Sequence, residues 1–189
     1  RERQRVLLTG LLPDISTDLA IETATDSIEA GRSGVIVAPV GVRPPLLAAV
    51  SSRAATPLVV LTATGRDAET LTNALASWIP GVAMLPAWET LPHERLSPQV
   101  DTMARRIAVL RRLVHPVEGD DSAGPISVLV VPIRAFLQPI ISGLADLEPV
   151  RVRAGDIMDL TDVTNRLAEL GYERVDMVEG RGQMSVRGG

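Results

Sequence analysis

The run Leu58-Val59-Val60-Leu61-Thr62-Ala63 is followed at once by Thr64-Gly65-Arg66-Asp67 and then by a helical pattern. A short, continuous apolar run rich in β-branched residues is typical of a strand buried on both faces of a parallel sheet. After the turn, apolar residues recur at i, i+4, i+7 and i+8, which marks the core-facing side of a helix: Leu71, Leu75, Trp78 and Ile79. Thr64 or Asp67 suits the N-cap of this helix, an interpretation we favour over a small-ligand loop. The stretch therefore predicts one strand–helix unit.

Three further apolar runs predict three more strands, at residues 34–40, 82–85 and 127–132. Helical patterns alternate with these strands at residues 6–32, 46–50, 102–114 and 133–144. Pro44 or Pro45 suits the first turn of the second of these helices, because no N–H is needed there. Strands that alternate with helices predict an α/β fold, in which a parallel sheet is flanked by helices.

The pattern changes near Glu148. Residues 150–153 alternate between apolar and charged side chains, which predicts a half-exposed strand. A helix over residues 159–170 and short strands over residues 172–178 and 184–186 follow. We therefore expect one domain over residues 1–148. Over residues 149–189 we expect the first part of a small α+β domain that is incomplete at its C-terminus.

The composition excludes several kinds of chemistry. The chain has 189 residues, a formal charge of −4, no cysteine and two histidines, and all 19 of its Lys+Arg residues are arginines. Without lysine there is no P-loop lysine and no Schiff-base nucleophile. Without cysteine there is no disulfide, thiol nucleophile or thiolate zinc ligand. No run approaches the ~18 apolar residues of a membrane span, so we expect a cytoplasmic protein that does not bind membranes.

The loop over residues 38–45, which follows the strand predicted at residues 34–40, is a poor site for phosphate. In nucleotide-binding folds this turn holds phosphates with backbone N–H groups, and a lysine completes the site. Here residues 38–45 contain one glycine and three prolines, and proline has no N–H. We therefore predict the outline of a nucleotide-binding fold without its nucleotide site, and no cofactor in this chain.

The least ordinary loop is Leu85-Pro86-Ala87-Trp88-Glu89-Thr90-Leu91-Pro92-His93-Glu94-Arg95-Leu96-Ser97-Pro98. One alternative is a small α/β enzyme that uses Glu89, His93 and Asp101. The spacing of these residues matches no known metal-ligand pattern. We favour a rigid structural loop in which Trp88 packs on the core while the charged groups stay solvated.

Four arginines on the predicted helix over residues 102–114 define a second alternative, a DNA-binding module: Arg105, Arg106, Arg111 and Arg112. Such a row of arginines can contact the phosphate backbone of DNA. However, the chain is acidic and only 2% aromatic, so base stacking has no support. We favour a solvated helix face.

Arg187 is followed by Gly188 and Gly189, which allow the backbone to turn and the guanidinium group to project. The planar fork of arginine pairs with carboxylates at protein interfaces. We therefore predict that Arg187 binds a partner, with Gly188 and Gly189 as turn residues.

The loop over residues 85–98, together with Asp101 and the arginine helix after it, resembles a signature of the bacterial transcription-repair coupling factor (Mfd), in its N-terminal, UvrB-like module. The structural signature positions are Trp88, Glu89, Pro92 and Pro98. Residues 182–189 also resemble the later part of that module. The resemblance implies a helicase-like, degenerate P-loop NTPase fold without ATP-binding motifs, into which a small UvrA-binding domain is inserted.

By the same resemblance, the chain is expected to be a non-catalytic adaptor that recruits UvrA to lesions where RNA polymerase has stalled. The UvrA-contacting arginine of the family falls on Arg187. The parent protein would be an ATP-dependent DNA translocase. Its motor, with ATP and Mg, and its contacts with RNA polymerase and DNA would lie in other domains.

Overall fold

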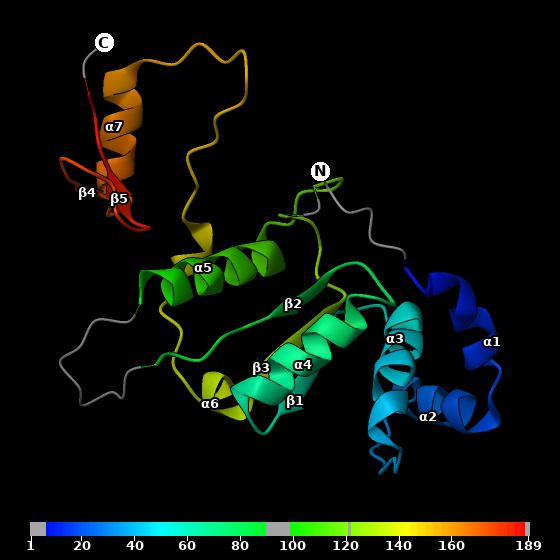
Figure 1. Ribbon diagram of the computed structural model, residues 1–189. Helices are drawn as coiled ribbons and strands as arrows, with labels where there is room; N and C mark the ends of the chain where they lie inside the picture. The colour runs from blue at the N-terminus through cyan, green and yellow to red at the C-terminus, as the bar shows by residue number, and fades with distance from the viewer. Residues whose placement is uncertain (1–6, 90–98, 121, 188–189) are drawn as a thin grey trace.

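The computed structural model describes residues 7–89, 99–120 and 122–187 of the chain. Figure 1 shows an α/β body and, at the end of a long connection, a smaller group of elements that we call the C-terminal unit (residues 159–187). The α/β class with a parallel sheet and flanking helices is confirmed.

Strand β3 (Val128–Pro132) is the centre of the main sheet. It lies between β1 (Leu58–Thr62) and β2 (Val82–Met84), and both pairs are parallel. The helices and 3-10 turns of the body are η1 (Thr9–Leu11), α1 (Leu12–Ser16), α2 (Leu19–Glu29), η2 (Val40–Val42), α3 (Arg43–Arg53), α4 (Gly65–Leu75), α5 (Val100–Val114), α6 (Ile133–Phe136) and η3 (Leu144–Asp146).

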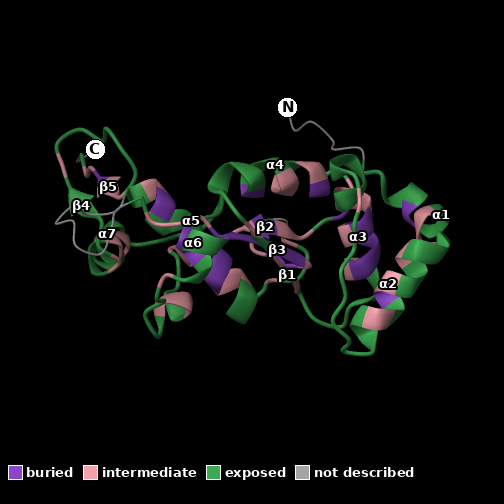
Figure 2. Cartoon of the chain, turned by 90° about the horizontal axis from the view of Figure 1, so that it is seen from below, coloured by how far each residue is buried: buried purple, intermediate pink, exposed green. Residues whose placement is uncertain are grey.

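Alternate residues of β3 point into two separate hydrophobic clusters. Val128 and Val130 pack with residues of α1, α3 and α4, whereas Leu129 and Val131 pack with residues of β2, α5 and α6. Because strand side chains alternate between the two faces, a strand covered by helices on both sides must be apolar at every position. Figure 2 shows this buried centre along β2 and β3.

Local signals start and end the helices as the sequence predicts. The side chain of Thr64 accepts a hydrogen bond from the backbone N–H of Asp67 at the start of α4, so the capping interpretation is confirmed. Pro44 lies in the first turn of α3. Gly31, at φ +66°, follows the C-terminus of α2, where glycine accepts the left-handed conformation.

Two predictions about the strands are wrong. Residues 34–39 form no strand, and the side chains of Val35 and Val37 are 92% and 95% exposed. An apolar run favours extended backbone but does not specify a partner strand. In addition, β1 is covered on one face only, because Val59 and Leu61 are about half exposed.

The predicted elements after β3 are shorter than expected. Only α6 and η3 are helical within residues 133–146, and residues 150–153 are not a strand. The C-terminal unit contains α7 (Leu160–Glu169), β4 (Glu173–Arg174) and β5 (Gln183–Met184), and its two short strands pair in parallel. Among the described helices, none has the length and apolar character needed to cross a membrane.

Replacing Gly81 by alanine is expected to lower the free energy of unfolding by about 2 kcal/mol, because a left-handed, crowded position tolerates no side chain. Gly81 has φ +72°, and a Cβ atom there would lie 2.8 Å from Ser127 Oγ and 2.9 Å from the backbone oxygen of Pro125. Urea denaturation measures the loss. Gly65→Ala is the control, since a Cβ atom there meets nothing within 4 Å. Equal stability of both variants would contradict this prediction.

Candidate functional site

The C-terminal unit is organised by a capped helix and two short strands. Asp159 accepts hydrogen bonds from the backbone N–H groups of Asp162 and Thr161, which lower the pKa of its carboxyl group and start α7. Gly171, at φ +86°, ends the helix and directs the chain into β4. The β4–β5 pair is closed by a hydrogen bond from Glu173 N–H to the carbonyl oxygen of Gly182.

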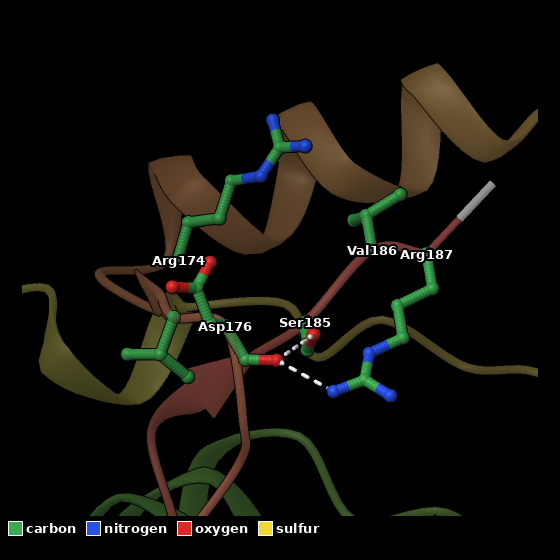
Figure 3. A pocket seen from close by; sticks show the side chains of 6 residues that line it. Arg174, Asp176, Ser185, Val186 and Arg187 are labelled. Carbon is green, nitrogen blue, oxygen red and sulfur yellow. Dashed lines mark hydrogen bonds between the residues drawn. The ribbon is translucent and has the colours of Figure 1, made fainter.

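A pocket of about 510 Å³ lies at the C-terminal ends of β4 and β5 and the residues that follow them. Its lining residues are Arg174, Val175, Asp176, Ser185, Val186 and Arg187. Figure 3 shows the guanidinium groups of Arg174 and Arg187 pointing in different directions from this lining. Two cationic groups against one carboxylate make the pocket attractive to acidic groups, and its geometry suits two separate acidic groups better than one.

Arg187 is held by the segment that follows β4. One of its terminal nitrogens donates to the backbone oxygen of Asp176 at 3.2 Å, and Ser185 Oγ donates to the same oxygen at 3.0 Å. Guanidinium has five N–H donors, so this bond fixes the direction of the side chain and leaves donors for a partner. Arg187 is exposed, as predicted, whereas Gly188 and Gly189 lie outside the described residues.

Of the residues that line this pocket, the sequence identified Arg187 only, and the second cationic residue, Arg174, was not predicted. It lies at the end of β4, two residues before Asp176. The pairing of Arg174 with Met184 of β5 brings it beside the residues that follow β5, and no local sequence pattern signals that pairing.

The signature loop packs on α5 through a buried arginine. Arg106 is 1% exposed; its guanidinium carbon lies 4.4 Å from the centre of the Trp88 ring, and it donates to the carbonyl oxygen of Pro86 at 2.6 Å. Burial lowers the pKa of Arg106. The backbone N–H of Trp88 also donates to Gln138 Oε1 at 2.8 Å. The predicted solvated face of the helix is therefore wrong for Arg106, because the face of an indole ring offers a site for a desolvated cation.

The carboxylates of the enzyme alternative have structural partners. Glu89 accepts a hydrogen bond from Thr102 Oγ1, which lowers the pKa of Glu89. Asp101 forms ion pairs with Arg105 and Arg181. His93, Pro92 and Pro98 lie outside the described residues. In the described part of the chain, no three potential ligands cluster so that they could hold a metal ion.

Two more arginines of α5 contact loops, so the predicted solvated face is also wrong for Arg111 and Arg112, whereas Arg105 is exposed as predicted. Arg111 donates to the carbonyl oxygen of Leu147 at 3.0 Å, and Arg112 donates to that of Gly124 at 2.8 Å. A guanidinium group can satisfy loop carbonyls that have no strand or helix partner. These contacts fasten two loops to α5 and fix the directions of both side chains.

The N-terminus of α3 does not suit a phosphate. Its first turn contains Pro44 and Pro45, so two of the N–H groups that would face an anion are missing, and Arg43 precedes them. The residue types at this helix start therefore do not fit a nucleotide.

Residues 150–189 match the family described as the UvrB interaction domain. Over 157 residues, 82% of its length, the chain is 46% identical to the transcription-repair-coupling factor of Mycobacterium tuberculosis. It is 26% identical over 145 residues, 76% of its length, to the protein of the same name from Escherichia coli. In both cases the chain spans about 12% of the length of the relative.

A shorter similarity points to a second kind of protein. Over 53 residues, 25% of its length, the chain is 47% identical to the UvrABC system protein B of Vibrio vulnificus, of which it spans 8%. The same chain thus shares sequence with transcription-repair-coupling factors over most of its length and with UvrB over a segment.

Proposed function

Since the chain is an N-terminal, UvrB-like module of the transcription-repair coupling factor (Mfd) type, we propose that it is a non-catalytic adaptor that binds UvrA. One observation carries the proposal: the pocket with Arg174 and Arg187 lies within the residues that match the UvrB interaction domain. An exposed, arginine-lined surface suits recognition of an acidic partner.

The contact with UvrA is carried by Arg187, with Arg174 as a second contact. Both guanidinium groups keep donors free, and bidentate pairing with a carboxylate uses two of them at once. Gly188 and Gly189, which follow Arg187, lie outside the described residues, and their role as turn residues stays a prediction. This division of roles is part of the proposal.

The larger protein in which such a module works is proposed to be an ATP-dependent DNA translocase of the cytoplasm. ATP and Mg belong to its motor, and RNA polymerase and DNA bind to other domains. The module would then recruit UvrA to lesions where RNA polymerase has stalled. The poor fit of the α3 N-terminus to a phosphate supports the absence of a nucleotide cofactor in this chain.

The fold is proposed to be a degenerate, helicase-like version of a P-loop NTPase, with a domain boundary at residue 148. The parallel sheet of order β1-β3-β2, with helices packed on both faces, supports this proposed fold. In this view Trp88, Glu89, Pro92 and Pro98 are structural residues of the signature loop, which is consistent with the hydrogen bonds and stacking of the first two.

Arg187→Ala is expected to weaken UvrA binding about 30-fold, the effect of losing an interface arginine worth about 2 kcal/mol. Isothermal titration of the chain with purified UvrA measures this. Arg166→Ala is the matched control, because Arg166 is exposed on α7, pairs with Glu169 and does not line the pocket. The proposal fails if the unaltered chain does not bind UvrA, or if Arg187→Ala binds as tightly as Arg166→Ala.

A further inference from the structure

The carboxylate of Asp101 joins helix α5 to the C-terminal unit. Its Oδ1 lies 2.8 Å from a terminal guanidinium nitrogen of Arg181, and its Oδ2 lies 2.7 Å from Nε of Arg105. Asp101 is in the first turn of α5, and Arg181 lies just before β5. The Asp101–Arg181 pair therefore connects two parts of the protein that are joined along the chain by the long segment seen in Figure 1.

A close backbone contact accompanies this ion pair. Gly182 has φ +80°, and a Cβ atom at that position would lie 3.0 Å from Cγ1 of Val100. The backbone of Gly182 thus lies directly on the side chain of Val100, where a larger residue would force a shift. Arg181 and Gly182 together rest on the first two residues of α5.

This contact lies next to the pocket. Gly182 accepts the hydrogen bond of Glu173 N–H that closes the β4–β5 pair, and β5 begins at the following residue. The chain then runs through Ser185 to Arg187, both of which line the pocket. A rotation of the segment at Gly182 would therefore change the direction in which the pocket faces.

Helix α5 provides a fixed base for this contact. Thr102 is bonded to Glu89, and Arg106 is buried against Trp88, so the N-terminal half of α5 is tied to the signature loop. Arg111 ties its C-terminal half to the carbonyl oxygen of Leu147, where the long connection begins.

We propose that Asp101 is a latch: its ion pair with Arg181 holds the C-terminal unit in one orientation on α5, and breaking the pair releases that unit. The latch therefore regulates how the pocket is presented. The effect on the presentation of the pocket rests on the proposed function, whereas the Asp101–Arg181 ion pair involves no partner protein. The side chains of Asp101 and Arg181 are 36% and 70% exposed, so the pair is solvated, weak and sensitive to salt. These properties suit a contact that opens and closes.

Distances between two spin labels test the latch. The chain has no cysteine, so Glu69→Cys on α4 and Ala168→Cys on α7 can be labelled selectively; both positions are exposed. Pulsed electron–electron double resonance on the full 189-residue chain is expected to give a narrow distance distribution. Arg181→Ala and Asp101→Asn are expected to make this distribution about twice as wide, and so is 1 M NaCl, which screens a solvated ion pair.

Arg105→Ala is the matched control, because it removes the other partner of Asp101 and leaves the Arg181 pair intact. Its distribution should stay narrow. The proposal is overturned if Arg181→Ala is as narrow as the unaltered chain, or if Arg105→Ala is as wide as Arg181→Ala. The measurement is made without UvrA, so its failure is distinct from a failure of the Arg187→Ala titration.

Discussion

Arg106→Ala is expected to lower the free energy of unfolding by about 3 kcal/mol, as for other losses of a buried, hydrogen-bonded side chain. The substitution removes the stacking on Trp88 and the hydrogen bond to the carbonyl oxygen of Pro86. A desolvated cation–π contact contributes about 2 kcal/mol and a hydrogen bond to a charged group about 1.5–3 kcal/mol. The cost of burying the guanidinium group, which also lowers its pKa, offsets part of this sum.

Two variants separate the causes of this loss. Arg105→Ala is the matched control on the same helix. Arg105 is 64% exposed and pairs with solvated Asp101, so a loss below about 1 kcal/mol is expected. Arg106→Met keeps most of the side-chain volume without the charge. Denaturant unfolding followed by Trp fluorescence measures all three. If Arg106→Met is as stable as the unaltered chain, the polar contacts of Arg106 contribute no net stability.

The central strand of the sheet, β3, could be predicted from its own continuous apolar sequence. All five residues of β3 are buried, as expected for a continuous apolar run at the centre of a parallel sheet that is covered on both faces. Residues 34–40 have the same kind of sequence but remain unpaired and exposed. Whether such a run pairs depends on tertiary contacts that the run does not encode.

The site was predictable only in part, for a related reason. The sequence places Arg187 at an exposed position, but Arg174 joins it through the pairing of β4 with β5. Arg106 shows the opposite error. The helical spacing of the apolar residues of α5 assigns Arg106 to the polar side, yet Trp88 and the carbonyl oxygen of Pro86 cover that side. A helical pattern predicts the core-facing side and does not predict which loop covers the rest.

Arg174→Glu combined with Arg187→Glu is expected to weaken UvrA binding more than 100-fold, roughly 3 kcal/mol or more, because like charges placed opposite each other cost several kcal/mol. The two guanidinium groups point in different directions, so each is expected to face its own acidic group and the two effects should nearly add. The same titration with UvrA measures the loss, and the two single variants test the additivity.

A second double variant separates the effect of the overall charge of the chain from the effect of the position of the two substitutions. Arg153→Glu combined with Arg166→Glu changes the formal charge by the same amount at two exposed arginines that do not line the pocket. This control should weaken binding by less than about threefold, since distant solvated charges are screened beyond about 8 Å at physiological salt. The pocket variant should also regain part of its affinity as salt rises, because screening reduces the new repulsion. Equal losses for the two double variants would mean that UvrA responds to the overall charge of the chain and not to this pocket.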